Sequence, residues 1–233
     1  MDDRLRPRPR KAGRAVTERL GDLLRTLKVW DRELPVFDPE TAPDDPLDLF
    51  TDWFAGAVAA GEVEPHTMTL ATADAEGDPD ARTVMLHGAD ERGWQFATHR
   101  GSAKGRQLAV RPRAALHFYW PAVARQVRLR GSVTAAGPEE SAADLARRSP
   151  GALAAALVGR QSEVLDSYGT LQRAADAAWE RARREPDATV PGHTLYLLAP
   201  ERVEFFQGDP ARRHVRVNYR REQGGWVREL LWP

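Results

Sequence analysis

The amino-acid sequence predicts a mainly β domain with added helices, arranged as an antiparallel barrel rather than as a sheet of β–α–β units. Three observations support this class: segments with strand character dominate, short turns join most of them, and helical segments are inserted at only a few places. The chain has 233 residues, of which 42% are hydrophobic and 29% are charged. A chain of this size and composition buries a sizeable core, and one domain is the simplest expectation.

Residues 1–43 are expected to lie outside the main domain, which we place at residues 44–233. Residues 1–14 are rich in arginine and proline and are predicted to be a disordered tail, with an RNA-binding arm as the less favoured alternative. Residues 15–28 have apolar residues at helical spacing. Residues 31–46 carry the prolines and acidic residues of an extended linker.

A helix is predicted to begin at Pro46, because the aspartates before it can cap the helix and proline suits the first turn. Strand patterns fill most of the remaining chain. One hairpin loop is expected at residues 74–78, where Gly77 favours a positive φ, and a second at residues 222–225. The predicted strands are residues 66–73, 81–87, 94–98, 114–120, 126–135, 194–198, 202–206, 215–221 and 226–231.

Residues 138–185 are predicted to form a helix-rich insertion in the strand pattern. Its second half, residues 162–184, is long and amphipathic. This insertion and the N-terminal helices are expected to pack on the outside of the barrel. The positions expected to be buried on the long helix are Val164, Leu165, Tyr168, Leu171, Ala175 and Trp179.

Composition and missing motifs argue against several classes of function. Basic and acidic residues number 34 each, and this balance argues against binding to nucleic acid or to an anionic membrane. The chain has no cysteine, which fits a cytoplasmic location, and no apolar run long enough to span a membrane. The six histidines are scattered, so no metal site is predicted, and no phosphate-loop, dinucleotide or serine-hydrolase motif is present. An enzyme of this kind would therefore take its reactivity from a cofactor.

A Ser-x-Lys-Gly-Arg turn between two strands is the strongest candidate for a binding site. Backbone N–H groups, a hydroxyl and cations at such a strand–helix junction suit one phosphate. The candidate ligands are Arg82, on a neighbouring strand, and Ser102, Lys104 and Arg106 of the turn. Each of these residues alone is consistent with a capping or surface position, and it is their clustering that favours a phosphorylated cofactor.

Motifs that occur in a fixed order over residues 44–233 resemble the pyridoxamine 5'-phosphate oxidase family. Motifs kept in order over such a span are much more specific than any one of them. The resemblance implies an FMN-binding split β-barrel homodimer, with the flavin at the subunit interface. The motifs include Arg-x-Val-x-Leu at 82–86, Ser-x-Lys-Gly-Arg at 102–106, Arg-Gln-Val at 125–127, Arg-Gln-Ser at 160–162, Val-Glu-Phe-Phe-Gln-Gly at 203–208 and Arg-Arg-His at 212–214.

The resemblance also implies which residues contact the flavin. Arg82 and Lys104 would hold its phosphate. Phe206 stands where the family normally has a tryptophan, so this position keeps an apolar ring but loses the indole N–H. The full set implied for the cofactor is Arg82, Thr83, Val84, Met85, Thr98, Ser102, Lys104, Gln126, Gln161, Ser162, Phe206 and Arg216.

The substrate side departs from the family pattern. His87 stands where the family has a lysine that holds the substrate phosphate. Counting back without gaps from the Gln-Ser pair places Asp144, Arg148 and Ala152 where the family has tyrosine, arginine and serine, so only the arginine matches. Each lost charge-assisted hydrogen bond costs about 1.5–3 kcal/mol, and the three losses together are expected to abolish useful affinity for pyridoxamine or pyridoxine phosphate.

Arg212 and His214 match the family's Arg-x-His pair, which faces the reacting part of the substrate, and they are the expected catalytic pair. A preserved reaction centre with a lost phosphate anchor is similar to the phenazine-biosynthesis branch of the family. We therefore expect an FMN-dependent oxidase that acts on a planar reduced aromatic or nitrogen-heterocyclic metabolite, with dioxygen as electron acceptor. The alternatives are a genuine pyridoxamine or pyridoxine 5'-phosphate oxidase and a non-enzymatic split barrel that binds flavin or haem.

Overall fold

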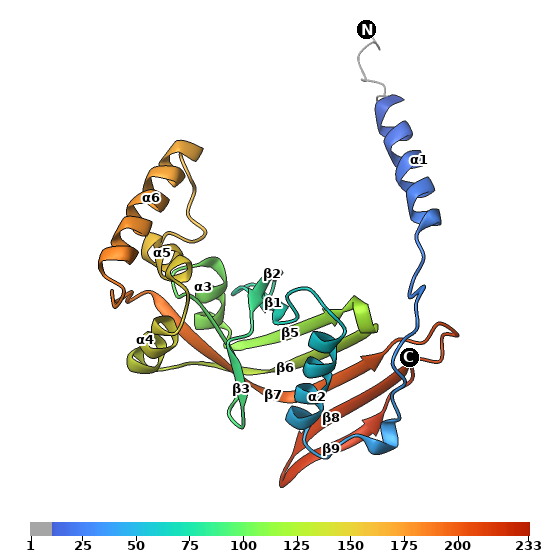
Figure 1. Ribbon diagram of the computed structural model, residues 1–233. Coiled ribbons are helices and arrows are strands. Elements are labelled where there is room, and N and C mark those ends of the chain that lie inside the picture. Colours follow the sequence, from blue (N-terminus) through green and yellow to red (C-terminus); the bar gives the residue numbers. More distant parts are fainter. Residues whose placement is uncertain (1–10) are drawn as a thin grey trace, which may run out of the picture.

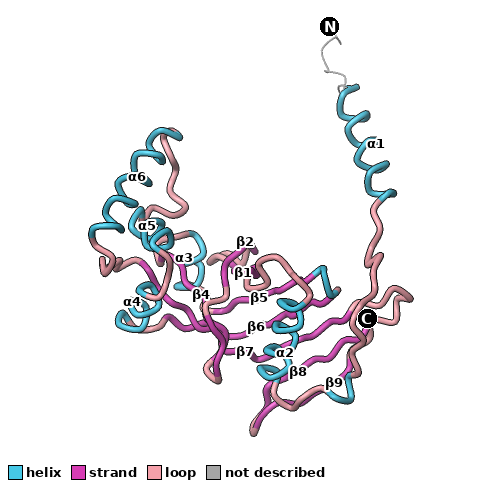
Figure 2. The backbone as a smooth tube through the Cα atoms, viewed as in Figure 1, coloured by secondary structure: helices cyan, strands magenta, loops and turns pink. Residues whose placement is uncertain are grey.

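The computed structural model describes the backbone of residues 11–233 and the side chains from residue 19 onward. Its centre is one nine-stranded antiparallel sheet, curled into a half-barrel, with helices around it (Figures 1 and 2). The antiparallel class predicted from the short turns is confirmed. The strands are β1 (Thr67–Ala73), β2 (Pro79–Met85), β3 (Gly88–Asp90), β4 (Gly93–His99), β5 (Arg113–Trp120), β6 (Arg125–Ala135), β7 (His193–Gln207), β8 (Val215–Glu222) and β9 (Gly225–Leu230).

Strand order follows the sheet from β2 through β1, β5, β6 and β7 to β4 and β3, and β8 and β9 continue from the second half of β7. Both predicted hairpin loops are present, and Gly77 has the expected positive φ of 97°. The helices are α1 (Lys11–Thr26), α2 (Pro46–Ala59), α3 (Ala103–Val110), α4 (Pro138–Ala146), α5 (Pro150–Val158) and α6 (Tyr168–Arg184), with short 3-10 turns at Pro39–Thr41 and Pro121–Val123.

The long strand β7 replaces two strands that the sequence predicted separately. Its first half pairs with β4, its second half pairs with β8, and β6 accompanies it along nearly its whole length. The register between β6 and β7 shifts between Arg130 and Gly131. A side chain at Gly131 would lie 1.9 Å from the carbonyl oxygen of Ala199, so only glycine allows the two strands to approach here. This shift lets one continuous strand serve both ends of the sheet.

Helix α2 lies across one face of the sheet and anchors the core (Figure 1). It begins at Pro46, as predicted. The Asp45 carboxylate caps it by accepting a hydrogen bond from the backbone N–H of Leu47 at 2.8 Å. Phe50 packs edge-on against Phe118 at 5.1 Å between ring centroids, and Trp53 packs against Phe205 at 5.2 Å. These contacts fix α2 on β5 and on β7.

The segment before α2 is fixed by Tyr219 of β8. Its hydroxyl donates a hydrogen bond to the carbonyl oxygen of Pro43 at 2.6 Å. Burial raises the pKa of Tyr219 to about 12, so the phenol remains a donor over the whole physiological range. The linker is therefore fastened to the interior of β8, between β7 and β9.

The prediction of which residues are buried in and before α6 is wrong. The helix begins at Tyr168 rather than at residue 162, because Ser167 caps it by accepting a hydrogen bond from the backbone N–H of Thr170 at 3.2 Å. The small residues Ala178 and Ala182 are the buried ones, and they pack against the short helix α5. Five of the six predicted core positions are exposed by 40% or more, namely Val164, Leu165, Tyr168, Leu171 and Trp179.

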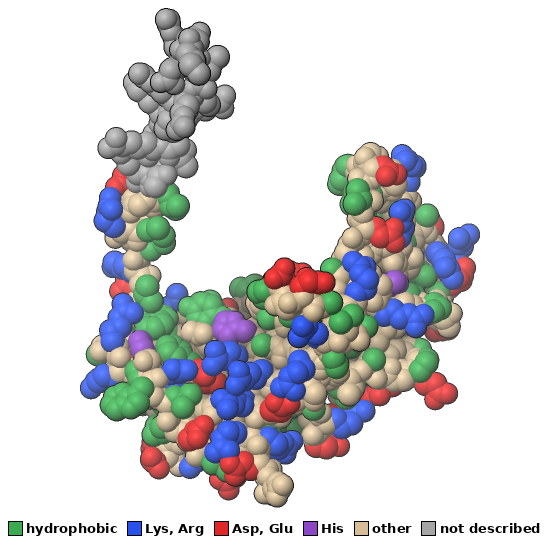
Figure 3. All heavy atoms as spheres, turned by 180° about the vertical axis from the view of Figure 1, so that it is seen from behind, with side chains coloured by type: hydrophobic (Ala, Val, Ile, Leu, Met, Phe, Trp, Pro, Cys, Tyr) green, Lys and Arg blue, Asp and Glu red, His purple; other side chains and the backbone are tan. Residues whose placement is uncertain are grey.

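The N-terminal helix α1 stands away from the half-barrel (Figures 1 and 3). It covers Lys11–Thr26, so residues 11–14 are helical and not part of a tail, and the prediction for residues 1–10 lies outside the described residues. Its predicted apolar positions do share one face, but they are more than half exposed: Leu20, Leu23, Leu24 and Leu27. Among the helices that the structure describes, none is long and apolar enough to cross a membrane.

Candidate functional site

The predicted site residues fall into two groups, each held by different elements. The first group surrounds the start of α3, and the second lies where β6, β7 and β8 meet. Among the described residues, no hydrogen bond or ion pair joins the two groups. The first group contains Arg82, Thr83, Val84, Met85, His87, Thr98, Ser102, Lys104, Asp144, Arg148, Gln161 and Ser162, and the second contains Gln126, Phe206, Arg212, His214 and Arg216.

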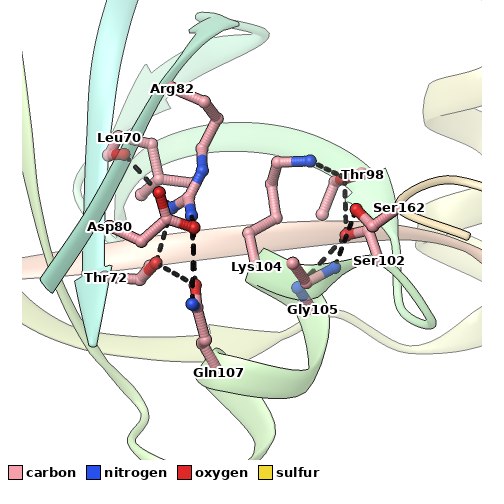
Figure 4. A network of polar contacts seen from close by, with 11 residues as sticks. Leu70, Thr72, Asp80, Arg82, Thr98, Ser102, Lys104, Gly105, Gln107 and Ser162 are labelled. Atoms are coloured by element: carbon pink, nitrogen blue, oxygen red, sulfur yellow. Dashed lines mark hydrogen bonds and ion pairs between the residues drawn. The ribbon is translucent and has the colours of Figure 1, made fainter. Parts of the chain in front are cut away.

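Arg82 projects from β2, and its guanidinium is fixed by several partners (Figure 4). It donates to the hydroxyl of Thr72 and, at 3.1 Å, to the amide oxygen of Gln107, and it forms an ion pair with Asp80. Its side chain is only 18% exposed, whereas that of Asp80 is 49% exposed. The cation is therefore oriented in advance, and water can reach the carboxylate that balances it.

Lys104 reaches the same region from α3 (Figure 4). Its ammonium donates to the hydroxyl of Thr98 at 3.4 Å. Burial lowers the pKa of Lys104, and the positive charge of Arg82 lowers it further, while Asp80 opposes the shift. Two neighbouring cations that disfavour each other are stabilised by an anion placed between them. This arrangement fits the terminal phosphate of FMN.

The start of α3 is shaped by Ser102 and Gly105. Ser102 is fully buried, and its hydroxyl accepts a hydrogen bond from the backbone N–H of Gly105 at 3.2 Å. A side chain at Gly105 would lie 2.3 Å from the carbonyl oxygen of Arg100, so the turn needs glycine at this position. In the structure Ser102 thus acts as a helix cap, and its contact with the flavin phosphate stays a prediction.

The Gln161–Ser162 pair is brought to the same turn by the loop that precedes α6. The hydroxyl of Ser162 accepts a hydrogen bond from the backbone N–H of Ala103 at 3.1 Å, and the amide oxygen of Gln161 accepts one from Thr98 at 3.1 Å. The guanidinium of Arg106 instead bonds back to a carbonyl group of the turn. This bond holds the Arg106 side chain at the turn, and its role as a phosphate ligand stays a prediction.

A cavity of about 340 Å³ connects the cofactor residues with the predicted substrate residues. Its lining includes Thr98 and Gln161 from the first set and His87, Arg148 and Ala152 from the second. The structure therefore brings together residues that lie up to about 75 positions apart in the sequence. They meet at one opening beside Arg82 and Lys104, which we call the phosphate cluster. Their contacts with a ligand stay predictions.

Asp144 lies buried behind this cavity wall, in contact with His87, Arg148 and His193, which line the cavity. Its side chain is 1% exposed, and its carboxylate accepts hydrogen bonds from His87 at 3.0 Å, from Arg148 at 2.5 Å and from His193 at 3.2 Å. Burial alone would raise the pKa of this carboxyl, but the three hydrogen bonds outweigh it and hold the pKa of Asp144 far below its ordinary value. The carboxylate is therefore ionised, and it holds the guanidinium of Arg148 and the rings of His87 and His193 in place.

Three histidines that line the same cavity were not predicted from the sequence motifs. His66, His99 and His193 line it together with His87, so four of the six histidines in the chain meet here. They come from separate strands and turns, and no local spacing could have indicated that they lie together. Within the described part of the chain, no group of acidic residues and histidines is arranged to hold a metal ion.

Replacing Asp144 with asparagine is expected to lower the free energy of unfolding by about 2 kcal/mol near pH 7, because charge-assisted hydrogen bonds to a buried carboxylate are lost. The pKa of this carboxyl is lower in the folded chain than in the unfolded one, so its contribution is complete above about pH 4 and is lost as the pH falls below that value. Chemical denaturation at several pH values tests this.

The exposed Asp176 of α6 provides a control, since its replacement by asparagine should change stability little at any pH. If the difference between the wild-type chain and the Asp144→Asn variant stayed constant down to about pH 2, ionisation of Asp144 would not be its source.

The second group begins with Gln126 and Phe206, which lie opposite each other in the β6–β7 ladder. The amide oxygen of Gln126 is 3.0 Å from Nε2 of His117. Arg216 of β8 forms an ion pair with Glu204 at 2.9 Å. These residues form a polar surface where β6, β7 and β8 run side by side, and they supply no contact to the phosphate cluster of the same chain.

The predicted catalytic pair lies in the loop between β7 and β8. Nδ1 of His214 accepts a hydrogen bond from the backbone N–H of Asp209 at 3.1 Å, which leaves Nε2 available to a ligand. Arg212 has a positive φ of 67°. The His214 ring packs against Phe206 at 5.1 Å and against Trp30 at 5.1 Å. Trp30 was not predicted as a site residue, because nothing in the linker sequence indicates that it reaches this loop.

The sequence pattern of the family described as pyridoxamine 5'-phosphate oxidase matches residues 55–182. The chain belongs to this family. The pattern described as the C-terminal dimerisation region of pyridoxine 5'-phosphate oxidase matches residues 193–233 and includes Arg212, His214 and Arg216. The resemblance drawn from the motifs is thereby confirmed, as are the split-barrel fold class and the expectation of an FMN-dependent oxidoreductase.

Several relatives of this pyridoxamine 5'-phosphate oxidase family member cover most of its length. A pyridoxine/pyridoxamine 5'-phosphate oxidase from Pseudomonas paraeruginosa is 45% identical over 82% of this chain and 90% of its own, and one from Rubrobacter xylanophilus is 43% identical over 82% and 88%. Among solved structures, PhzG from Burkholderia lata in complex with tetrahydrophenazine-1-carboxylic acid has a TM-score of 0.80 and 27% identity. The alignment covers 87% of this chain and all of PhzG.

Proposed function

We propose that this family member is an oxidase with an altered substrate pocket, and that its substrate is a planar reduced aromatic or nitrogen-heterocyclic metabolite. The observation that carries the proposal is the buried carboxylate of Asp144, at the position where the family resemblance implies a phosphate donor. This carboxylate already holds His87 and Arg148. A substrate phosphate would meet a like charge and would have to compete for these donors, and both effects weaken its binding.

The similarity to PhzG supports the substrate class. That protein was crystallised with tetrahydrophenazine-1-carboxylic acid, a partly reduced tricyclic acid, and it aligns with 87% of this chain. A single carboxylate needs fewer donors than a phosphate dianion, and Arg212 can hold a carboxylate with paired hydrogen bonds. The cavity beside the phosphate cluster, with its alanine and leucine walls, offers apolar contact to a flat ring system.

Each residue has a defined role in the proposal. Arg82 and Lys104 hold the FMN phosphate, and bound FMN supplies a two-electron acceptor for the substrate. Arg212 binds the substrate carboxylate, and His214 orients the substrate and receives a proton through Nε2. Asp144 keeps His87 and Arg148 in fixed positions at the far wall of the cavity. Dioxygen is the proposed final electron acceptor.

We also infer that two copies of the chain complete each site. The phosphate cluster and the catalytic pair lie on different elements, with no described contact between them, so one chain alone does not bring them to one ligand. The second group lies largely in the region that matches the family's dimerisation region. In a symmetric homodimer, the phosphate cluster of one copy meets the catalytic pair of the other.

A genuine pyridoxine or pyridoxamine 5'-phosphate oxidase is the second candidate. It is favoured by the names of relatives that are more than 40% identical to this chain, and by Arg148, which keeps one of the expected phosphate donors. In that case Arg148 would have to leave Asp144 when the substrate binds.

The deciding experiment measures anaerobic flavin reduction in the purified, FMN-loaded protein. We expect rapid bleaching of the flavin absorbance by 5,10-dihydrophenazine-1-carboxylate and slow, unsaturated bleaching by pyridoxamine 5'-phosphate. Admission of dioxygen should then restore the colour. Efficient, saturable reduction by pyridoxamine 5'-phosphate alone would reject the altered-pocket proposal in favour of the second candidate.

A further inference from the structure

Trp30 lies against the catalytic pair although it belongs to the linker between α1 and the main domain. Its ring packs edge-on against His214, with the centroids 5.1 Å apart and the planes at 79°. The guanidinium carbon of Arg212 lies 5.7 Å from the centre of the indole, and Phe206 lies 6.4 Å away. The indole therefore contacts each of the residues that surround the proposed reaction centre in this half of the site.

The indole has a dedicated position beside Gly208. A side chain added at Gly208 would lie 3.0 Å from two carbon atoms of the Trp30 ring and 3.0 Å from the Cβ atom of Ala124. Any larger residue would push the ring away from the catalytic pair. The fit to Gly208 indicates that the indole is held against this loop.

The backbone at Trp30 supports the same conclusion. Its φ is 54°, a left-handed conformation that is unfavourable for a residue with a large side chain. Such a conformation persists only where surrounding contacts determine it, and it is most frequent at functional sites. Arg212, which faces the indole, also has a positive φ of 67°. The linker and the catalytic loop are thus both constrained where they meet.

The indole N–H of Trp30 has no hydrogen-bond partner among the described residues, although its nitrogen atom is buried. Buried donors in folded proteins nearly always have an acceptor, so this one is suited to a ligand. It also stands close to Phe206, the position at which the family resemblance implies a tryptophan. Trp30 therefore brings an indole donor back to this region from another part of the chain.

We propose that Trp30 is a specificity residue that contacts the substrate, with its ring against the substrate's planar system and its N–H donating to a heteroatom or a carboxylate oxygen. This inference rests on the proposed function in one respect, which is that the substrate is planar and lies at Arg212 and His214. It does not depend on whether the substrate carries a carboxylate or a phosphate.

The test measures ligand binding to the FMN-loaded, full-length protein by calorimetry, with phenazine-1-carboxylate and pyridoxal 5'-phosphate as probes. We expect Trp30→Ala to weaken binding of whichever probe the wild-type protein binds by about tenfold, and Trp30→Phe, which keeps a ring without the N–H, to weaken it by about threefold. The affinity for FMN, measured by quenching of flavin fluorescence, should change less than twofold in both variants.

Phe37→Leu is the matched control, because Phe37 anchors the same linker on Trp53 at 5.0 Å and is not one of the residues that meet at the catalytic pair. An unchanged affinity in Trp30→Ala, a tighter one, or an equal loss in Phe37→Leu would overturn the inference, since each would show that Trp30 only fastens the linker or blocks the site. A wild-type protein that binds only pyridoxal 5'-phosphate would reject the proposed substrate class, and the Trp30 variants would then be judged on that probe.

Discussion

Replacing both Arg82 and Lys104 with methionine is expected to weaken FMN binding by about a thousandfold or more, so that the protein is purified without yellow colour. In the proposed site each residue supplies a cation to one phosphate, and a charge-assisted hydrogen bond contributes about 1.5–3 kcal/mol. Removing Arg82 alone should have the larger single effect, because its guanidinium is 18% exposed and is already held by Thr72 and Gln107. Flavin fluorescence titrations of the apoprotein measure these affinities.

Replacing Lys104 alone is expected to affect the stability of the apoprotein and its affinity for FMN in opposite directions. Burial lowers the pKa of Lys104, and the positive charge of Arg82 lowers it further, so the charged ammonium should destabilise the folded apoprotein. Lys104→Met is therefore expected to leave the apoprotein as stable as the wild type, or more stable, while it loses flavin affinity. Arg111→Met removes a cation from the C-terminal end of the same helix and is the matched control. Unchanged FMN affinity in the double variant would contradict the assignment of the phosphate site.

The phosphate turn could be predicted from the sequence because its determinants are local. Ser102 caps α3 three residues before Gly105, and Lys104 lies between them, so short-range spacing fixes all three. Arg82 was added by the neighbouring strand pattern, and the β1–β5 and β1–β2 pairings bring it to the turn. Arg106 belongs to the same turn and bonds to the carbonyl oxygen of Gly101, and whether it also reaches a phosphate stays a prediction.

The surroundings of Asp144 could not be predicted in the same way. His87, in the turn between β2 and β3, lies 57 positions before it, and His193, at the start of β7, lies 49 positions after it, so only the folded sheet brings them together. A comparison of aligned positions placed Asp144 near His87, but it gave no information on His193. Trp30 is a stronger case, since its contact with the loop between β7 and β8 joins distant parts of the chain and no local pattern indicates it.

The exposed apolar faces show a further limit. Amphipathic spacing identified one apolar face on α1, but it did not indicate what covers that face. On α6 the periodic pattern favoured the large residues, whereas the small alanines are the ones buried, because the adjacent helix α5 is short and closely packed. Periodicity therefore predicts that a helix forms more reliably than it predicts the neighbour against which the helix packs.

Rebuilding the family's phosphate donors in the cavity is expected to lower the KM for pyridoxamine 5'-phosphate by about a hundredfold. The triple variant His87→Lys, Asp144→Tyr, Ala152→Ser adds a permanent cation and two hydroxyl donors and removes the carboxylate that now holds Arg148. Two recovered charge-assisted hydrogen bonds account for an effect of this size. The neighbouring cavity of about 340 Å³ provides room for the larger tyrosine side chain.

The size of the change in kcat distinguishes a restored phosphate site from a general change in the enzyme. The proposed reaction centre consists of Arg212 and His214, which the three substitutions do not touch, so kcat for pyridoxamine 5'-phosphate should change much less than KM. Asp176→Tyr, at an exposed position of α6, makes the same exchange outside the cavity and should leave both constants unchanged. If the wild-type protein already had a KM as low as that of the triple variant, Asp144 would not be a barrier to phosphate. The buried ion pairs would then be a structural feature of the cavity wall, and the substrate class would have to be sought among phosphorylated pyridines.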